Sequence, residues 1–253
     1  MLGSNGEAAS LDEGEKLDLV RAARRRANGR LVLVGTGLEA TAATIALTAK
    51  AADAGADAVL VLTPHYYKAQ MTVDALRGHF AAVADASPIP IYLYSVPVFT
   101  GLPFPPALAT AMAQHPNVAG MKESSGDLVL MSRILATVPP TFTLACGSAS
   151  VLYPALCLGA QAGILAVACC APDAAAAVYT AFAKGDHERA RQLQLALTAL
   201  ATAVTATYGV PGLKLAMDVA GFKGGVPRRP LLPAPASARE ELRRLLDQTR
   251  AAI

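Results

Sequence analysis

Short runs of hydrophobic residues recur along the chain, and each run is followed by a segment whose apolar positions have helical spacing. The runs are "RLVLVG" from residue 30, "DAVLVLT" from 57, "IPIYLY" from 89, "NVAGMK" from 117, "FTLAC" from 142 and "AGILAVA" from 162. Continuous apolar strands that alternate with amphipathic helices are typical of βαβ units in a parallel sheet. The pattern therefore predicts an α/β fold, and it allows a seventh strand that ends at Met1 and Leu2.

Helical segments are predicted between these strands, and beyond residue 186 only helices remain. Their ranges are 11–28, 38–54, 72–86, 105–114, 127–137, 149–159, 173–184, 186–207, 211–221 and 237–252. We expect residues 1–185 to form the strand-containing domain and residues 186–253 to form a helical C-terminal extension. The apolar helix at 193–207 is a plausible subunit contact.

Two architectures fit the alternation, a doubly wound open sheet and a (β/α)8 barrel. Polar groups follow many successive strands, in the segments "TPHYY", "YSVP", "KESSG" and "CGS". In a barrel the carboxyl ends of all strands meet at one mouth, whereas an open sheet spreads them along an edge. The polar strand ends therefore favour the barrel, although the pattern alone barely separates the two.

Composition and charge narrow the class of protein. Hydrophobic residues make up 53% of the chain and charged residues 16%, which excludes a disordered chain. The net charge of +3 comes without an interleaved basic and aromatic patch, so no nucleic-acid partner is expected. The densest basic run, Arg21 to Arg26, suits the C-terminus of a helix. No uninterrupted 18-residue apolar stretch is present, so no membrane span is expected.

Cysteine and histidine spacing bears on redox state and metals. The cysteines are Cys146, Cys157, Cys169 and Cys170. They show no CxxC spacing and lie in apolar segments, so we expect them to be reduced and buried, in a cytoplasmic protein. The four histidines form no HxxxH or similar pattern, and no metal is predicted.

Lys122 lies at the end of the predicted strand that starts at 117, behind a run of apolar and small residues. An ammonium group buried there is costly unless it is paired or has lost its proton. A neutral amine in a partly dry site is a nucleophile toward a ketone, and the product is a Schiff base. Gly120 should leave room beside it. Alternatively Lys122 has passed the strand end and reaches water, and the local sequence leaves both possibilities open.

Two other segments carry groups that suit such chemistry. Tyr94 ends "IPIYLY", and its phenol could relay protons during imine formation, although a tyrosine at a strand end is more often a packed ring. The segment "GSNGE", Gly3 to Glu7, offers closely spaced backbone N–H groups that suit a carboxylate. An ordinary turn that caps a helix explains the same residues.

Taken in order, "GSNGE", "TPHYY", "YSVPVFTG", "GMKESSGD" and "GVPGLK" resemble the dihydrodipicolinate synthase and N-acetylneuraminate lyase family over essentially the whole chain. The resemblance implies a class I aldolase or lyase on a (β/α)8 TIM barrel with a helical C-terminal extension. It implies a homo-oligomer, usually a tetramer built as a dimer of dimers. The implied substrate is a small 2-oxo acid, pyruvate or a relative, held as a covalent lysine imine without any separate cofactor.

The resemblance also implies roles for individual residues. Lys122 looks like the imine-forming lysine, Tyr94 like the proton-relay tyrosine and Ser4 like the small hydroxyl of the relay. Tyr66 matches a tyrosine that many relatives contribute across a dimer interface, so the isolated subunit would be incomplete. The substrate-binding positions implied are Ser4 and Asn5, through their backbone amides, and Gly147 and Ile164, as pocket walls.

One departure from the family bears on the substrate. In dihydrodipicolinate synthases the turn after the relay tyrosine commonly carries an arginine for the carboxylate of aspartate semialdehyde, but "YSVPVFTG" has Val98 and Phe99. A guanidinium fork suited to a carboxylate is therefore missing. The sequence favours a 4-hydroxy-2-oxoglutarate aldolase, which releases pyruvate and glyoxylate. A 4-hydroxy-tetrahydrodipicolinate synthase and another sugar-acid aldolase stay open as alternatives.

A second departure concerns the N-terminus. Relatives have a further β-strand and helix, and most of the next strand, before the position of Gly3. We therefore expect a barrel that lacks its first β/α unit and most of its second strand, with exposed edges. A mis-assigned start, a gap filled by a partner or by a distortion of the barrel, and an inactive chain that serves only in assembly all remain open.

Overall fold

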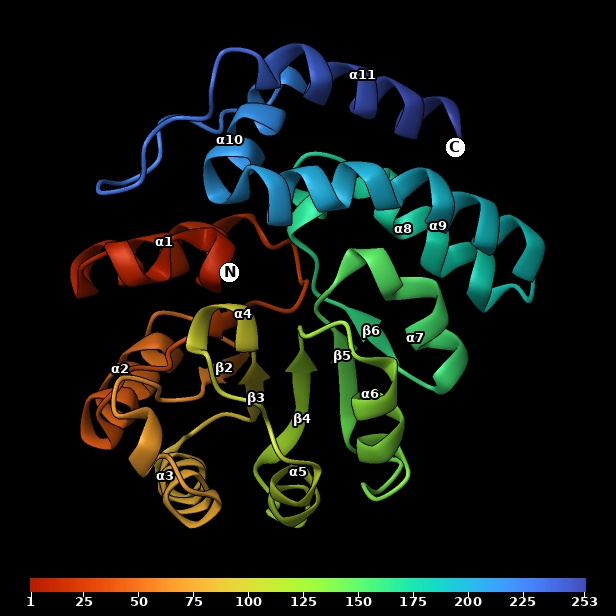
Figure 1. Ribbon diagram of the computed structural model, residues 1–253. Helices are drawn as coiled ribbons and strands as arrows, with labels where there is room; N and C mark the ends of the chain where they lie inside the picture. Colours follow the sequence, from red (N-terminus) through yellow and green to blue (C-terminus); the bar gives the residue numbers. More distant parts are fainter. The chain divides into compact units, whose positions relative to one another are not determined.

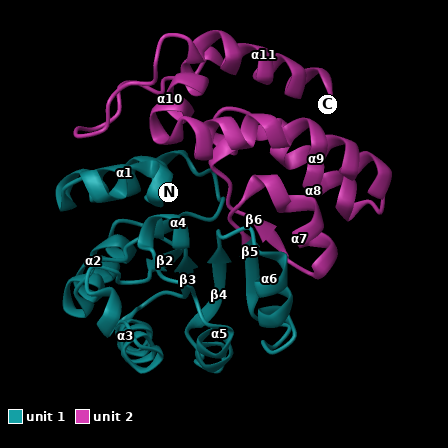
Figure 2. Ribbon diagram, in the orientation of Figure 1, with its two compact units in different colours: residues 1–145 teal, residues 146–253 magenta.

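The computed structural model describes residues 1–253. The chain forms two compact units, Met1–Ala145 and Cys146–Ile253 (Figure 2). Six strands form one sheet in the order β1-β2-β3-β4-β5-β6, so each strand neighbours the one that precedes it in the chain. The pairings of β1 with β2, β2 with β3 and β3 with β4 are parallel. The predicted α/β class with a parallel sheet is confirmed.

The strands overlap the six predicted runs. Their bounds are β1 Leu33–Gly35, β2 Ala58–Leu62, β3 Ile91–Ser95, β4 Val118–Glu123, β5 Thr143–Cys146 and β6 Ala162–Gly163. The sixth run was predicted wrongly over most of its length, because Ala166–Cys169 forms a short 3-10 helix, η5. An apolar run of this length does not by itself distinguish a strand from a buried helical turn.

The helices of the first unit pack on one another in chain order, α1 on α2, α2 on α3, α3 on α5 and α5 on α6 (Figure 1). Their bounds are α1 Glu13–Arg26, α2 Thr41–Asp53, α3 Val73–Ala86, α4 Pro97–Thr100, α5 Pro106–Met112 and α6 Leu128–Leu135. Asp12 and Glu15 form a capping box at the start of α1, and three arginines occupy its last turn. The basic run thus ends a helix, as predicted.

The second unit is mainly helical. Its helices are α7 Leu152–Leu158, α8 Pro172–Ala183, α9 His187–Thr202, α10 Gly209–Val219 and α11 Ala238–Ala251. Helix α9 continues as a π-helical segment, Ala203–Thr207, so the long helix predicted over 186–207 is confirmed. The division of the chain into a domain of residues 1–185 and an extension of residues 186–253 stays a prediction.

The first residues of the chain run beside β1. Gly35 donates its N–H to the Met1 carbonyl over 2.9 Å, and the Met1 ammonium donates to the Leu33 carbonyl over 2.6 Å. A Cβ on Gly35 would lie 1.9 Å from the Leu2 carbonyl oxygen, so this close approach requires glycine. Short 3-10 helices then follow, η1 Ser4–Gly6 and η2 Ala8–Ser10 in this segment, and η3 Lys68–Gln70 and η4 Ala149–Val151 farther along.

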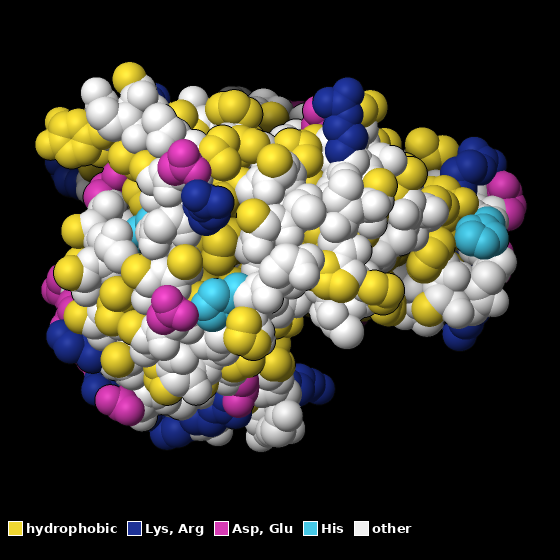
Figure 3. Space-filling model, turned by 90° about the horizontal axis from the view of Figure 1, so that it is seen from below, with side chains coloured by type: hydrophobic (Ala, Val, Ile, Leu, Met, Phe, Trp, Pro, Cys, Tyr) yellow, Lys and Arg dark blue, Asp and Glu magenta, His cyan; other side chains and the backbone are white.

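The burial of the cysteines was predicted only in part. Cys146 and Cys170 are buried, but Cys157 and Cys169 are exposed, and none of the four forms a disulfide. The buried face of α7 consists of Leu152, Ala155 and Leu156, which have the i, i+3, i+4 spacing of one helical face, and Cys157 lies outside it. On the face shown in Figure 3, Lys and Arg side chains are interspersed with acidic, hydrophobic and uncharged ones. None of the helices is long and apolar enough to cross a membrane.

His79 is a buried polar side chain in the interface between α2 and α3. Its Nδ1 shares a hydrogen bond of 2.9 Å with the Thr41 hydroxyl, while its Nε2 is buried without a partner. Burial lowers the pKa of His79 from 6.5 to about 4, and the negative charge of Glu39 only partly opposes this. The imidazole is therefore neutral in the folded protein at neutral pH.

This burial predicts a loss of stability in mild acid. The unfolded chain takes up the His79 proton near pH 6.5 and the folded chain only near pH 4, so the free energy of unfolding falls as the pH drops through this range. The contribution of this group amounts to about 3 kcal/mol. Urea unfolding of wild type and His79→Gln between pH 7 and 4 measures it, since carboxyl titration is common to both. Parallel curves for the two proteins would contradict the prediction.

Candidate active site

The candidate site is built at the carboxyl ends of two neighbouring strands. Tyr94 in β3 lies opposite Lys122 in β4, and Ser95 lies opposite Glu123. Side chains alternate along a strand, so the Tyr94 and Lys122 side chains lie on one face of the sheet and those of Ser95 and Glu123 on the other. The predicted tyrosine and lysine are thus brought together.

A register shift in β4 produces this pairing. Ile91 pairs with Val118 but Tyr92 pairs with Gly120, so one residue of β4, Ala119, is left over. Without that shift Tyr94 would face Met121. A bulge of this kind changes the direction in which the following side chains point. The bulge therefore decides which residue of β4 faces the tyrosine.

Three polar groups form a chain at this point. The Lys122 Nζ donates to the Tyr94 Oη over 3.4 Å and lies 4.4 Å from the centroid of the ring. The Tyr94 Oη also shares a hydrogen bond of 3.2 Å with the Ser4 Oγ. Because a phenol both accepts and donates, it can pass a proton between the amine and the serine hydroxyl.

The amine is buried rather than solvated. Lys122 is 7% exposed and Tyr94 3%. The tyrosine belongs to a small apolar cluster with Leu60 and Val96, against which Leu33, Leu62 and Tyr92 also pack. The alternative in which Lys122 simply reaches bulk water is therefore excluded by its burial.

Gly120 does not serve the lysine in the expected way. A Cβ at this position would lie 2.1 Å from the Thr143 carbonyl oxygen and 2.9 Å from a ring carbon of Tyr92. The space predicted beside the amine is thus already taken by the neighbouring strand and by the Tyr92 ring. Gly120 allows close packing in the sheet instead.

The segment "GSNGE" forms a tight turn beside the amine. A Cβ on Gly3 would lie 3.9 Å from the Lys122 Nζ. The turn's own hydrogen bonds are donated by the N–H groups of Gly6 and Glu7 to the carbonyls of Gly3 and Ser4. Glu7 has a φ of 55°, a left-handed conformation that non-glycine residues adopt at a cost. The segment therefore holds Ser4 close to Tyr94 and places Asn5 next to it.

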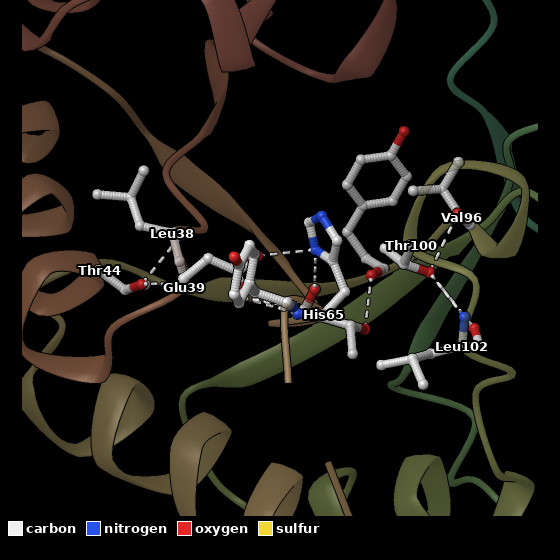
Figure 4. Close-up of polar contacts among 10 residues, drawn as sticks. Leu38, Glu39, Thr44, His65, Val96, Thr100 and Leu102 are labelled. Carbon is white, nitrogen blue, oxygen red and sulfur yellow. Dashed lines mark hydrogen bonds and ion pairs between the residues drawn. The ribbon is translucent and has the colours of Figure 1, made fainter. Parts of the chain in front are cut away.

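Tyr66 lies apart from this cluster, with 76% of its surface exposed. Its backbone N–H and that of His65 each donate to the Glu39 Oε2 over 2.9 Å. The His65 Nδ1 lies 2.9 Å from the Glu39 Oε1 and 3.2 Å from the Thr63 carbonyl oxygen (Figure 4). Glu39 thus fixes the turn that carries Tyr66, and no contact joins Tyr66 to Lys122 within the chain.

The turn after Tyr94 carries no cation. It forms the short helix α4, and the Thr100 hydroxyl ties it by donating to the Val96 carbonyl and accepting the Leu102 N–H, each over 3.3 Å (Figure 4). Val98 and Phe99 project from it with 79% and 55% of their surfaces exposed. The position at which many dihydrodipicolinate synthases carry an arginine is therefore apolar here.

Two other predicted residues lie in the second unit. Gly147 follows β5, and Ile164 follows β6 and donates its N–H to the Cys146 carbonyl over 2.9 Å. Their roles as pocket walls stay predictions. No group of three or more His, Cys, Asp or Glu side chains is arranged to hold a metal ion.

Sequence reasoning missed Glu123, Ser95 and Glu39. Glu123 is fully buried beside Ser95, directly after the lysine in the chain. The sequence does contain a signal for Glu123: it follows Lys122 in one strand, so alternation turns its side chain to the opposite, helix-covered face of the sheet. Glu39 carried no comparable signal, since its partners come from a turn 26 and 27 residues away.

Curated relatives cover almost the whole chain. It is 36% identical over 247 residues to the 4-hydroxy-tetrahydrodipicolinate synthase of an Exiguobacterium species, covering 97% of this chain and 84% of that protein. It is 34% identical over 244 residues to the 4-hydroxy-tetrahydrodipicolinate synthase of Archaeoglobus fulgidus, covering 96% of this chain and 83% of that protein.

Solved structures agree in fold. Dihydrodipicolinate synthase from Thermotoga maritima superposes with a TM-score of 0.94 at 28% identity, covering 100% of this chain and 86% of that one. YagE, a prophage protein of the dihydrodipicolinic acid synthase family from E. coli K12 solved with pyruvate, gives a TM-score of 0.90 at 30% identity, covering 99% of this chain and 86% of that one.

Residues 1–249 match the dihydrodipicolinate synthetase family. Its members are aldolase-type lyases that work through a lysine Schiff base, and the chain is an enzyme of this kind. The relatives are named as 4-hydroxy-tetrahydrodipicolinate synthases, and none of these names supports the narrower resemblance to 4-hydroxy-2-oxoglutarate aldolases. The match extends over nearly the full length and includes the lysine and tyrosine at the strand ends, so the chain belongs to the dihydrodipicolinate synthetase family.

Proposed function

We propose that the chain binds a pyruvate-derived 2-oxo acid as an imine at Lys122. The observation that supports this is the buried amine, 7% exposed, which donates to the Tyr94 Oη over 3.4 Å. An amine held in a site from which water is largely excluded is suited to attack a ketone. The phenol beside it and the Ser4 hydroxyl beyond it supply the proton transfers that the reaction requires.

In the proposed reaction the amine adds to the C2 carbonyl carbon of the 2-oxo acid. The carbonyl oxygen takes up a proton and the nitrogen loses one, which gives a neutral carbinolamine. Its hydroxyl takes up a second proton and leaves as water, so that a protonated imine remains. Tyr94 is placed to carry these protons, because its oxygen lies within hydrogen-bond distance of both Lys122 and Ser4. The protonated imine withdraws electrons from the adjacent carbon, so a bond to C3 can form or break through an enamine.

The carboxylate of the 2-oxo acid is proposed to lie against the "GSNGE" turn. The backbone amides of Ser4 and Asn5 are the proposed donors, because successive N–H groups in a tight turn suit an anion. Their support is the position of this turn, since a Cβ on Gly3 would lie 3.9 Å from the Lys122 Nζ. Gly147 and Ile164 are proposed as pocket walls from the resemblance alone, and no cofactor besides the covalent imine is proposed.

Two candidates remain for the second reactant. The names of the curated relatives favour condensation of pyruvate with aspartate semialdehyde, as in a 4-hydroxy-tetrahydrodipicolinate synthase. The exposed Val98 and Phe99 favour cleavage of 4-hydroxy-2-oxoglutarate instead, because no guanidinium is present at this turn to bind the aldehyde's carboxylate. We place the synthase first on the strength of the relatives, with the aldolase second.

Assembly and location are also proposals. Tyr66, Tyr67, Val98 and Phe99 are exposed apolar side chains of the first unit. The Lys68 side chain reaches the turn at Gly101, where a Cβ would lie 3.1 Å from its Cε, so the two segments are neighbours. We propose that a second copy covers this surface and that Tyr66 completes the partner's site. A barrel of the (β/α)8 type to which this chain contributes its six strands, a tetramer and a cytoplasmic location are further proposals. They follow from the resemblance and from cysteines that form no disulfide.

Loss of the amine should abolish imine formation. Incubation with pyruvate and borohydride should add a reduced three-carbon adduct at Lys122 in wild type and none in Lys122→Met, because only a primary amine at this position forms the imine. Tyr94→Phe should still form the adduct but roughly 10²- to 10⁴-fold more slowly, because proton relay is lost. Intact-mass and peptide mass spectrometry measure both. An adduct at another lysine, or none in folded wild type, would reject the proposal.

A substrate panel separates the two candidates. If the synthase is correct, wild type consumes aspartate semialdehyde with pyruvate faster than it releases glyoxylate from 4-hydroxy-2-oxoglutarate; the reverse order establishes the aldolase. Phe99→Arg should lower the half-saturating concentration of aspartate semialdehyde roughly tenfold in either case, because a charge-assisted bond to its carboxylate is restored. Pyruvate adduct formation serves as the control and should not change. No gain from the arginine would contradict the assigned role of this turn.

The exposed tyrosine pair predicts a self-association surface. Tyr66→Asp and Tyr67→Asp each place a charge on it and should weaken association of the subunits at least tenfold, because the charge would be desolvated in the interface. Sedimentation velocity across a concentration series measures the change. Val129→Asp, at an exposed position of α6 outside both predicted contact surfaces, is the matched control. An unchanged association constant in both tyrosine variants would rule out this surface.

A further inference from the structure

Glu123 is a fully buried carboxyl group that the proposed reaction does not use. It is 0% exposed, it follows Lys122 in β4, and its side chain lies on the opposite face of the sheet. Charged residues are almost never buried to this extent without a partner of opposite charge, and no ion pair involves Glu123. Its presence beside the reactive lysine therefore needs an explanation of its own.

The contacts of Glu123 join the ends of two strands. Its Oε1 accepts the backbone N–H of Ser125 over 2.9 Å, from the turn that follows β4. The same oxygen accepts the hydroxyl of Ser95 over 3.4 Å, from the last residue of β3. The backbone continues the link, because the Ser124 N–H donates to the Ser95 carbonyl over 3.0 Å. One carboxyl oxygen thus bridges β3 to the turn after β4.

The second oxygen, Oε2, is buried without a hydrogen-bond partner. Burial raises the pKa of Glu123 above its usual range, and the donors of Ser125 and Ser95 only partly oppose this. The bridge uses Oε1 only as an acceptor, a role that an amide oxygen of the same shape can also fill.

We infer that Glu123 is a positioning residue, which holds Tyr94 and Lys122 at hydrogen-bond distance by tying the strand ends that carry them. Ser95 and Glu123 are each one residue beyond the reacting pair, in the same register. A change at this bridge is transmitted to the pair through single peptide units. This inference rests on the proposed function, since it concerns the geometry of imine formation at Lys122.

The geometry predicts an effect on rate rather than on binding. A shift of about 1 Å between reacting groups can cost as much as 10²-fold in rate. In Glu123→Ala the bridge is lost, so imine formation at saturating pyruvate should slow roughly 10- to 100-fold. The half-saturating pyruvate concentration should change by less than roughly threefold, because the carboxylate-binding turn lies elsewhere in the chain. Glu123→Gln keeps an acceptor of the same shape without charge and should restore the rate to within roughly threefold of wild type.

The experiment measures the rate of borohydride-trapped adduct formation against pyruvate concentration for wild type, Glu123→Ala and Glu123→Gln. Val83→Ala, which removes buried apolar volume in α3 away from the strand ends, is the control for loss of stability and should keep the wild-type rate below its melting temperature. If Glu123→Ala does not fold, Ser95→Ala removes the hydroxyl donor alone and should slow the reaction in the same direction. In the double variant the two effects should not add, since both act through one bridge.

The outcomes are distinct. A folded Glu123→Ala with the wild-type rate overturns the inference. A Glu123→Gln as slow as Glu123→Ala overturns it too, because either result shows that the acceptor at this position does not set the rate. Additive effects of the Ser95 and Glu123 substitutions overturn it as well. If wild type itself forms no adduct, the proposed function falls and this inference falls with it. An adduct in wild type together with an unaffected Glu123→Ala removes the inference alone.

Discussion

The site depends on the register between β3 and β4. Parallel strands hydrogen-bond evenly along their length, so the register could place any pair of residues opposite each other. One additional residue in β4, Ala119, shifts the pairing so that Tyr94 faces Lys122. The 3.4 Å contact between the phenol and the amine is a consequence of this shift. The polar chain to Ser4 exists only because that contact is made.

Burial strengthens the contact between the Lys122 amine and the Tyr94 phenol. In water an amine and a phenol at this distance would interact weakly, whereas in a site with little solvent the same polar contact is stronger. The cost of burying the amine is offset by its contact with the Tyr94 oxygen and by the face of the Tyr94 ring, whose centroid lies 4.4 Å away. Glu123 lies at the same strand end but on the other face, so the sheet separates the two ionisable groups. The polar contacts of each group therefore come from residues on its own face of the sheet.

The similarity to known relatives supports the fold more strongly than it supports the choice of reaction. Solved members of the family superpose with TM-scores above 0.9 although fewer than a third of the residues are identical. Such folds carry different substrates through side chains on the loops that follow the strands. In this chain Thr100 holds the loop after β3 while Val98 and Phe99 project from it. The choice of second reactant is therefore a property of a few exposed residues and not of the architecture.

The sequence by itself determined the alternation of strands and helices and the position of Lys122 and Tyr94 at strand ends, because hydrophobic periodicity and strand length are local properties. Only the tertiary structure decided which residues face one another. The bulge at Ala119, the bridge from Glu123 to Ser95 and the turn fixed by Glu39 all join segments distant in the chain. The 3-10 helix at Ala166–Cys169 likewise took the place of the second half of a predicted strand. Register, exposure and pairing depend on contacts between neighbouring strands, and the pattern along one strand does not contain them.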